Sequence, residues 1–297
     1  MKGIKLYFII CCLCVVFFGA IIKHGDARIG LTESNYSIHR QIQYSFTLQN
    51  RTNRLLKKAE FWTYAPLKQT STQRCVNLEI SHPYQLILDD LGNQILYFKF
   101  HNLSPYTTKI ITIKADLTLS DTPNPIPVTD INAFLRAEKY IESDDPGLSR
   151  FAKKFKAPKP VETVEGIFRW VAENVQYAGY LRNDRGALYA LRNKQGDCTE
   201  FTSLFVALCR ANNIPARGIG GYVCSENNIL KPNDYHNWAE FYDDDVWRIA
   251  DPQKKVFMQD QSNYIAMKVI GESPKNPMRK FHWFRFAGDG LKVKMNQ

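Results

Sequence analysis

Outside the apolar run near its amino terminus, the sequence has no CxxC pair and no second long apolar run, and it holds no low-complexity tract. The lack of CxxC pairs argues against a structural zinc site. The lack of a second apolar run argues against repeated membrane crossing. The net charge of +10 is spread over 297 residues, and its densest clusters are as short as Lys57-Lys58. A nucleic-acid-binding surface needs a dense basic stripe, so we expect no nucleic-acid partner.

The apolar run at residues 6–22 predicts a targeting segment. Lys2 and Lys5 precede this run, and Lys23 follows it directly. The pattern fits a cleaved signal peptide as well as an uncleaved membrane anchor, and the sequence leaves both open. We therefore expect residues 1–27 to be a leader and the remainder to be exported, periplasmic or extracellular, with membrane contact through the leader.

Seven cysteines are present, and three of them lie in the apolar leader. The other four are Cys75, Cys198, Cys209 and Cys224, and their spacing forms no disulfide framework. If Cys198 stays free, the sequence is compatible with one disulfide among the remaining three and does not select the pair. Cys209 follows Leu208 on an expected helix, where core packing is the expected role.

Alternating apolar and polar residues predict an antiparallel β-sandwich at residues 28–122. The alternation is cleanest at residues 111–119, with isoleucine, alanine and leucine on one face and threonine, lysine and aspartate on the other. Similar runs occur at residues 42–48 and 96–100, and turn residues separate them. Several short strands of this kind are typical of a sandwich.

A second region, residues 123–297, is expected to hold the chemistry. A linker with three prolines at residues 120–127 leads into it. Beyond the linker, apolar residues recur at intervals of three and four, which predicts a helix that ends near Tyr177. Residues 130–140 are a candidate for an earlier short helix.

Three short segments of this second region carry a cysteine, a histidine and an aspartate. They read GDCTEF, with Cys198, then HNWAEF, with His236, and WRIAD, with Asp251. A thiol attacks carbonyls well only as a thiolate, so it needs an imidazole base, and the imidazole needs a carboxylate to fix its tautomer. The pattern predicts Cys198 as nucleophile, His236 as base and Asp251 as the residue that orients the base.

Cys198 is expected in the first turn of a helix, where free N–H groups and the positive end of the helix dipole would lower the thiol pKa. Gly196 would permit a sharp bend before the nucleophile. Strands are expected at residues 216–223, 236–242 and 246–249, and they carry the histidine and the aspartate. A helix with the cysteine packed on this antiparallel sheet, after a β-sandwich, is an α+β fold.

The three motifs, in this order, resemble the transglutaminase-like superfamily of papain-like cysteine enzymes. The resemblance covers about residues 130–297, and the preceding segment resembles the N-terminal β domain of bacterial exported members. It implies catalysis by Cys198, His236 and Asp251 through a thioester, with no metal and no organic cofactor. It also implies that the backbone N–H of Cys198 and a second donor stabilise the oxyanion.

The expected activity is that of a peptidase or amidase acting on envelope protein or peptide amides. Transglutaminase cross-linking and a non-catalytic envelope-binding protein are the alternatives. Tyr177 and Trp238 are candidate substrate-binding residues, although Trp238 also fits packing beneath the histidine strand. The acidic turn at residues 243–245 fits a solvated hairpin better than a calcium site, because no EF-hand spacing follows it.

Overall fold

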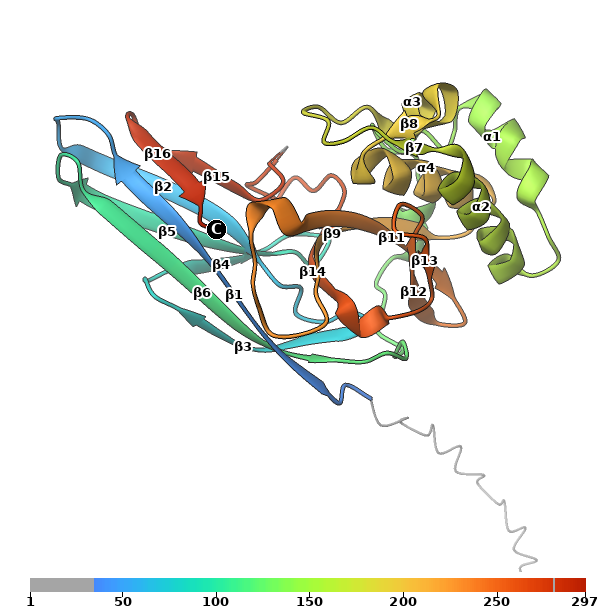
Figure 1. The fold of residues 1–297 in the computed structure, drawn as a ribbon, viewed down its shortest axis with the longest axis horizontal. Coiled ribbons are helices and arrows are strands. Elements are labelled where there is room, and N and C mark those ends of the chain that lie inside the picture. Colours follow the sequence, from blue (N-terminus) through green and yellow to red (C-terminus); the bar gives the residue numbers. More distant parts are fainter. Residues whose placement is uncertain (1–34, 280) are drawn as a thin grey trace, which may run out of the picture. The chain divides into compact units, whose positions relative to one another are not determined.

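The structure is a computed structural model that describes residues 35–279 and 281–297. These residues form one compact unit, Asn35–Gln297, with the β-rich part and the helices at opposite ends in Figure 1. The expected leader, residues 1–27, lies outside the described residues. Within the described ranges, no helix has the length and apolarity that a membrane crossing requires.

The first sheet of the sandwich is built around the longest strand. Strand β1 (Ile38–Asn50) pairs antiparallel with β6 (Thr108–Leu119), and β6 pairs antiparallel with β3 (Gln73–Ile80). Two strands from much later in the chain add to the other edge of β1. They are β10 (Asn228–Ile229), which is parallel to β1, and β16 (Leu291–Met295), which is antiparallel.

The second sheet has the order β15-β2-β5-β4 and faces the first. Its strands are β2 (Leu56–Ala65), β4 (Gln85–Leu88), β5 (Gln94–Leu103) and β15 (Phe284–Ala287). The alternating residues of both sheets meet in one core, which includes Phe46, Phe61, Phe98 and Ile113, each at most 1% exposed. The alternation in the sequence therefore does produce a sandwich, because one face of each strand is buried.

A third sheet, fully antiparallel, carries the candidate site residues. Its order is β13 (Val256–Phe257), β12 (Val246–Asp251), β11 (Tyr235–Asp243), β9 (Ala216–Val223) and β14 (Tyr264–Ile270). A two-stranded parallel pair, β7 (Gln176–Tyr177) with β8 (Gln195–Gly196), lies just ahead of the cysteine helix.

Four α-helices gather at one side of this sheet (Figure 1). They are α1 (Pro146–Ala152), α2 (Pro160–Asn174), α3 (Gly186–Asn193) and α4 (Cys198–Ala211). Helix α4 is the central one, with Leu204, Phe205 and Leu208 fully buried between the sheet and the other helices. Short 3-10 turns complete the fold at Ile131–Leu135, Lys153–Phe155, Pro232–Asp234 and Gln261–Asn263.

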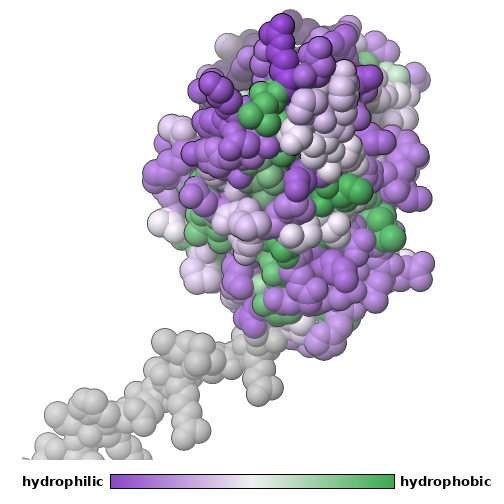
Figure 2. All heavy atoms as spheres, turned by 90° about the vertical axis from the view of Figure 1, so that its left-hand side faces the viewer, coloured by the Kyte–Doolittle hydropathy of each residue, from purple (hydrophilic) through white to green (hydrophobic). Residues whose placement is uncertain are grey.

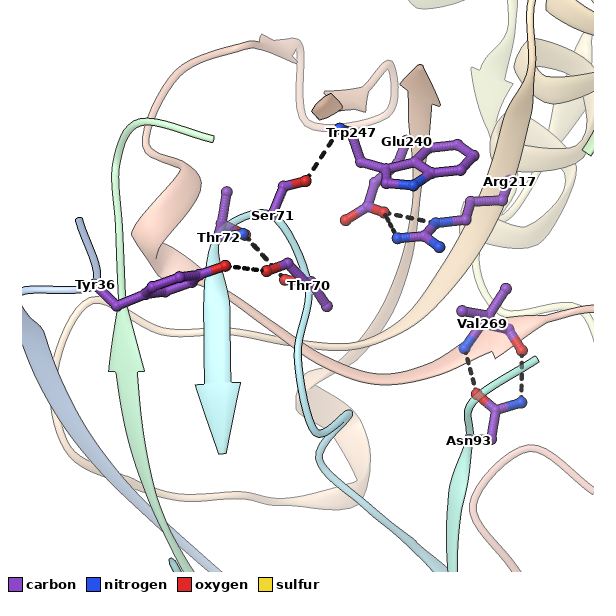
Figure 3. A network of polar contacts seen from close by, with 9 residues as sticks. All are labelled: Tyr36, Thr70, Ser71, Thr72, Asn93, Arg217, Glu240, Trp247 and Val269. Carbon is purple, nitrogen blue, oxygen red and sulfur yellow. Dashed lines mark hydrogen bonds and ion pairs between the residues drawn. The ribbon is translucent and has the colours of Figure 1, made fainter. Parts of the chain in front are cut away.

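Polar contacts join the sandwich to the third sheet (Figure 3). The side-chain amide of Asn93 bonds both backbone groups of Val269, at 2.7 and 3.1 Å. The Ser71 hydroxyl accepts from the backbone N–H of Trp247 at 3.1 Å. These bonds are made to backbone groups of the third sheet itself. The sandwich is therefore bonded directly to that sheet and is not joined to it through the linker alone.

A buried ion pair lies close to this junction. Arg217 on β9 and Glu240 on β11 are 2.7 Å apart, and the guanidinium also stacks over the Trp247 ring at 3.9 Å. Both side chains are less than a tenth exposed. Removing one partner of such a pair lowers the stability of the fold, because the other partner would remain as an unpaired buried charge.

The α+β architecture expected from the sequence is confirmed, while residues 130–140 hold only the 3-10 turn Ile131–Leu135 after Asp130. The boundary between residues 122 and 123 stays a prediction, and β15 and β16 return from beyond it to the sandwich. Cys75, Cys198, Cys209 and Cys224 are all free thiols.

The sandwich end remote from the helices presents a mainly hydrophilic surface (Figure 2). Hydrophobic side chains are scattered across this face as separate spots. Leu55 and Tyr106 are among the exposed large hydrophobic residues, and both lie in loops between sandwich strands. Scattered exposed residues of this kind are normal on protein surfaces and need no partner to explain them.

Candidate active site

Cys198 is the first residue of helix α4, and a capping box fixes that end of the helix. The Asp197 carboxylate accepts from the backbone N–H of Thr199 at 2.8 Å, and the Glu200 carboxylate accepts from the N–H of Asp197 at 3.0 Å. The other Glu200 oxygen accepts from the backbone N–H of Arg185 at 2.9 Å. The box therefore holds the turn of Cys198 and the loop before α3 together.

Gly196 is needed here for a reason other than the expected bend. Its φ is not in the left-handed region, so the backbone conformation does not require glycine. A Cβ atom at this position would lie 2.3 Å from the Cβ of Glu200, closer than atoms can approach. Gly196 thus makes room for the carboxylate that closes the capping box.

His236 and Asp251 form a tight buried pair. The imidazole Nε2 lies 2.6 Å from Oδ2 of Asp251, and the two residues are 6% and 1% exposed. The same carboxylate oxygen accepts from the Tyr264 hydroxyl at 3.0 Å, and Oδ1 accepts from the backbone N–H of Lys254 at 3.0 Å. With Nε2 engaged by Asp251, a neutral imidazole would carry its proton there and leave Nδ1 as the free basic atom.

The cysteine helix and the histidine strand are joined by the residues next to the two candidates. Asn237, which follows His236, donates its side-chain N–H to the hydroxyl of Thr199, which follows Cys198, at 3.0 Å. The backbone N–H of Asn237 also acts on the Cys198 thiol and favours its ionised form. These contacts bring Cys198 and His236 into one site, although no hydrogen bond joins thiol and imidazole in the part of the chain described.

The charge environment of Cys198 differs from the sequence-based expectation. Burial, followed by the negative charge of Asp197, raises the pKa of the thiol to about 12, and Asp251 and Glu200 act in the same direction. The expectation that the helix N-terminus lowers the thiol pKa is therefore wrong for the free protein. Its physical reason is that three nearby carboxylates and loss of water outweigh the end of the helix dipole.

Residues 149–252 match the family model of the transglutaminase-like superfamily. This chain carries a transglutaminase-like domain. A protein of Haemophilus influenzae described as uncharacterised is 32% identical over 98 residues, which are 31% of this chain and 26% of that protein. The match thus spans about a quarter of that relative's length.

Solved structures extend the likeness beyond the matched segment. A candidate cysteine protease from Cytophaga hutchinsonii superposes with a TM-score of 0.57 at 20% identity, covering 87% of this chain and 92% of that chain. An overlap of this extent includes the sandwich as well as the transglutaminase-like domain, so the two proteins share the fold of both parts. The periplasmic domain of TgpA from Pseudomonas aeruginosa is more distant, with a TM-score of 0.38 at 15% identity, 70% coverage of this chain and 92% of that chain.

A phenol that the sequence reading missed lies within the transglutaminase-like domain's site. The Tyr235 hydroxyl is buried and has no hydrogen-bond partner among the described residues, and burial, followed by the influence of Cys198, raises its pKa. Gly220 makes room for it, because a Cβ there would lie 2.1 Å from the hydroxyl oxygen. One feature of the sequence could have indicated this phenol. Tyr235 directly precedes the candidate histidine, and the strand that pairs with this segment contains two adjacent glycines.

An open cavity of about 840 Å³ begins beside the transglutaminase-like site. Two of its lining residues, Thr199 and Asn237, directly follow Cys198 and His236 in the chain. Its wall also includes Ser203, Asp184, Lys268 and His282. This volume is ample for several residues of a peptide, so the thiol end of the site has room for a substrate.

The two residues named as substrate contacts lie in different surroundings. Tyr177 is 59% exposed on β7 and pairs with Gly196, two residues before Cys198, so it lies at the rim of the candidate site. Trp238 is fully buried and packs edge-on against Tyr264 at 5.0 Å. It supports Tyr264 from within the core, which agrees with the packing role also considered for it.

Proposed function

We propose that this protein is an exported cysteine-dependent acyl-transfer enzyme that hydrolyses peptide or amide bonds. The observation that carries the proposal is the buried His236–Asp251 pair at 2.6 Å, tied to the cysteine helix through Asn237 and Thr199. A neutral imidazole fixed in this way is prepared to take a proton from a thiol beside it. The transglutaminase-like fold, whose enzymes use a cysteine nucleophile, supports the same assignment.

In the proposed reaction the Cys198 sulfur attacks the carbonyl carbon while its proton passes to Nδ1 of His236. Asp251 and Tyr264 stabilise the imidazolium, because the carboxylate is itself held by two donors besides the imidazole. The developing oxyanion accepts from the backbone N–H of Cys198 and from the unpartnered Tyr235 hydroxyl. His236 then gives the proton to the leaving amine as the C–N bond breaks, which leaves a thioester on Cys198.

The raised thiol pKa fits this order of events. A thiol with a pKa of about 12 is neutral at pH 7, so the nucleophile forms by proton transfer during attack rather than as a standing ion pair. Water resolves the thioester in the proposed hydrolase, since an exported enzyme works in bulk water. Resolution by an amine would make it a transglutaminase instead.

The location and target are part of the same proposal. The leader expected at residues 1–27 supports export, and an envelope protein or cell-wall peptide is the target that such a location offers. Amino-terminal sequencing of the exported protein tests the leader. A start at residue 28 supports cleavage, and an intact Met1 in the membrane fraction supports an anchor.

One observation favours a second candidate, a non-catalytic envelope-binding protein. The neutral thiol of the free protein would suit a site that only recognises peptide. The two candidates differ in whether function depends on the sulfur of Cys198. The three candidate residues are all present, and the buried, hydrogen-bonded state of His236 and Asp251 supports the enzyme.

Acylation by p-nitrophenyl acetate tests the proposal on the full chain. We expect a burst of p-nitrophenol and an acetyl group on Cys198 in the intact-mass spectrum, both absent from Cys198→Ala and strongly slowed in His236→Ala. An added amine such as glycine methyl ester then measures the partition between hydrolysis and aminolysis. Acetylation of Cys198 that is no faster in wild type than in His236→Ala would contradict the enzyme proposal.

A further inference from the structure

The cavity beside Cys198 contains one buried charge that lacks a close partner. Lys268 lines the cavity and is 7% exposed. Among the described residues its ammonium forms no ion pair and no hydrogen bond, and it lies 5.2 Å from the centroid of the Tyr64 ring. Burying an unpaired ammonium is costly, so such a group in a core position would normally have been replaced by an apolar one.

A β-bulge directs Lys268 into the cavity. The register between β14 and β9 shifts between Ala266 and Lys268, so Met267 is an extra residue on β14. Tyr264 and Ala266 before the shift and Val269 after it share one hydrophobic cluster, which leaves Lys268 on the opposite face. If the strand alternated regularly through Met267, Lys268 would share the face of Tyr264 and Ala266 and point into that apolar cluster.

The bulge also sets how far Lys268 lies from the nucleophile's neighbours. Gly220 on β9 pairs with Asn237 on one side and with Lys268 on the other, so the three residues form one row across adjacent strands. Two strand spacings separate the ends of this row by about 10 Å. An extended peptide advances about 3.4 Å per residue, so the row from Asn237, the neighbour of His236, to Lys268 corresponds to about three residues of a bound peptide.

The other charges of the cavity wall do not neutralise Lys268 at contact distance. Glu138 is engaged by Arg210 at 2.6 Å, and Asp184 by His282 at 3.4 Å. The remaining charged residues of the wall form no ion pair with Lys268 among the described residues; they are Lys139, Glu272 and Arg279. Asp184 still acts on Lys268 at longer range and opposes the effect of burial, which lowers the pKa of the lysine to about 8. The group is therefore mostly cationic at pH 7, with a counter-charge near but not bonded to it.

We propose that Lys268 binds a carboxylate of the substrate, so that the enzyme prefers acidic peptides with the acid about three residues from the bond attacked. The inference rests on Cys198 being the nucleophile. A buried lysine with three free donors and a cavity in front of it supplies the charge-assisted bonds that a carboxylate takes. The same charge repels an incoming substrate ammonium, which favours water over a lysine side chain as acyl acceptor.

Paired alkylating reagents test this directly on the wild-type chain at pH 7. The probes are N-iodoacetyl-diglycine and its C-terminal amide, which differ only in a carboxylate several bonds from the reacting carbon. Because the ratio of their rates at Cys198 cancels the thiolate fraction, it reports on the carboxylate alone. We expect a preference for the acid of about tenfold or more in wild type, since a buried charge-assisted bond replaces a neutral contact.

The preference should vanish in Lys268→Met and persist in Lys57→Met, which removes the same charge from the exposed face of β2. It should also fall as the pH rises through about 8, where Lys268 loses its proton. An equal ratio in wild type and Lys268→Met overturns the inference, as does the absence of any preference in wild type. Acetyl-glycyl-glutamic acid α-amide, which keeps only its side-chain carboxylate, is added as a competitor and distinguishes a side-chain carboxylate from a terminal one.

A binding measurement separates failure of this inference from failure of the proposed function. Saturation-transfer NMR with acetyl-triglycine and its amide, on Cys198→Ala and on the double variant with Lys268→Met, requires no thiol chemistry. Tighter binding of the acid to Cys198→Ala alone supports the lysine site even if Cys198 proves unreactive. If the acid and its amide bind Cys198→Ala with equal affinity, the lysine site is overturned, whatever the alkylation shows.

Discussion

The state of the Cys198 thiol in the free protein gives the sharpest prediction. Its pKa of about 12 lies three units above the ordinary 9.0, so at pH 7 the thiolate fraction is about 1,000-fold smaller than for an exposed thiol. A more basic thiolate is also more nucleophilic, which recovers part of the loss. With a Brønsted slope of 0.4–0.5, we expect alkylation by iodoacetamide to be about 30- to 60-fold slower than for an ordinary cysteine.

The measurement is the rate of Cys198 alkylation from pH 5 to pH 10, followed by peptide mass mapping. Mapping is needed because Cys75, Cys209 and Cys224 are buried but chemically similar. The same chain unfolded in urea supplies the ordinary thiol as reference. In the folded protein the rate should keep rising with pH up to pH 10 without a plateau, because the thiol is far from half ionised in that range.

His236→Ala separates the two roles of the imidazole. Alkylation depends on thiolate already present, so its rate should change little in this variant. Turnover of p-nitrophenyl acetate depends on proton transfer and should fall by a factor on the order of 100 to 10,000. A fast plateau already present at pH 5–6 in wild type, and lost in His236→Ala, would refute the argument, because it would mean a standing thiolate–imidazolium pair.

Three further predictions follow from the polar contacts of the site and its support. Asp251→Asn should lower kcat by a factor on the order of 10,000 with little change in KM, because the wrong tautomer is favoured, while Tyr264→Phe should cost far less, about tenfold; steady-state kinetics compare the two. Arg217→Ala should lower the free energy of unfolding by about 3–5 kcal/mol in urea titration, and the double variant with Glu240→Ala should not lose the sum, since no lone charge remains buried. Burial raises the pKa of Glu200 to about 7. The protonated carboxyl therefore stabilises the fold fully below about pH 4.5, and this stabilisation is lost as the pH rises through 7. The urea midpoint should fall between pH 5 and 8 in wild type and should change less over this range in Glu200→Gln.

The sequence predicts the regular parts of the fold because burial on one face leaves a periodic trace. The alternating residues 111–119 lie in β6, where every second residue of this run is buried, and the apolar stripe after Cys198 lies on α4. The strands that were expected to carry the histidine and the aspartate became β11 and β12. Each of these predictions depends on local spacing alone, and each is confirmed.

The features that the sequence did not reveal depend on contacts between distant segments. Nothing in the local pattern of Lys268 shows that a bulge turns it out of an apolar cluster. The thiol pKa of Cys198 depends on burial and on carboxylates brought close by folding, including Asp251 from another strand. The Tyr235 phenol acquires its position only because Gly220 on the next strand leaves space. A single sequence records none of these three relations.

The return of β15 and β16 to the sandwich has a consequence for how the chain folds. The Thr47 hydroxyl on β1 donates a hydrogen bond to the side chain of Asn296, 249 residues later. Strand β2 likewise pairs with β15, which is synthesised much later. Pairings of such long sequence separation form slowly, so β1 and β2 present open edges while everything between them and their partners is being synthesised. The nascent chain is therefore prone to edge-to-edge association until residue 295 is available, and a chain shortened before residue 284 should aggregate even though its Cys198, His236 and Asp251 are all present.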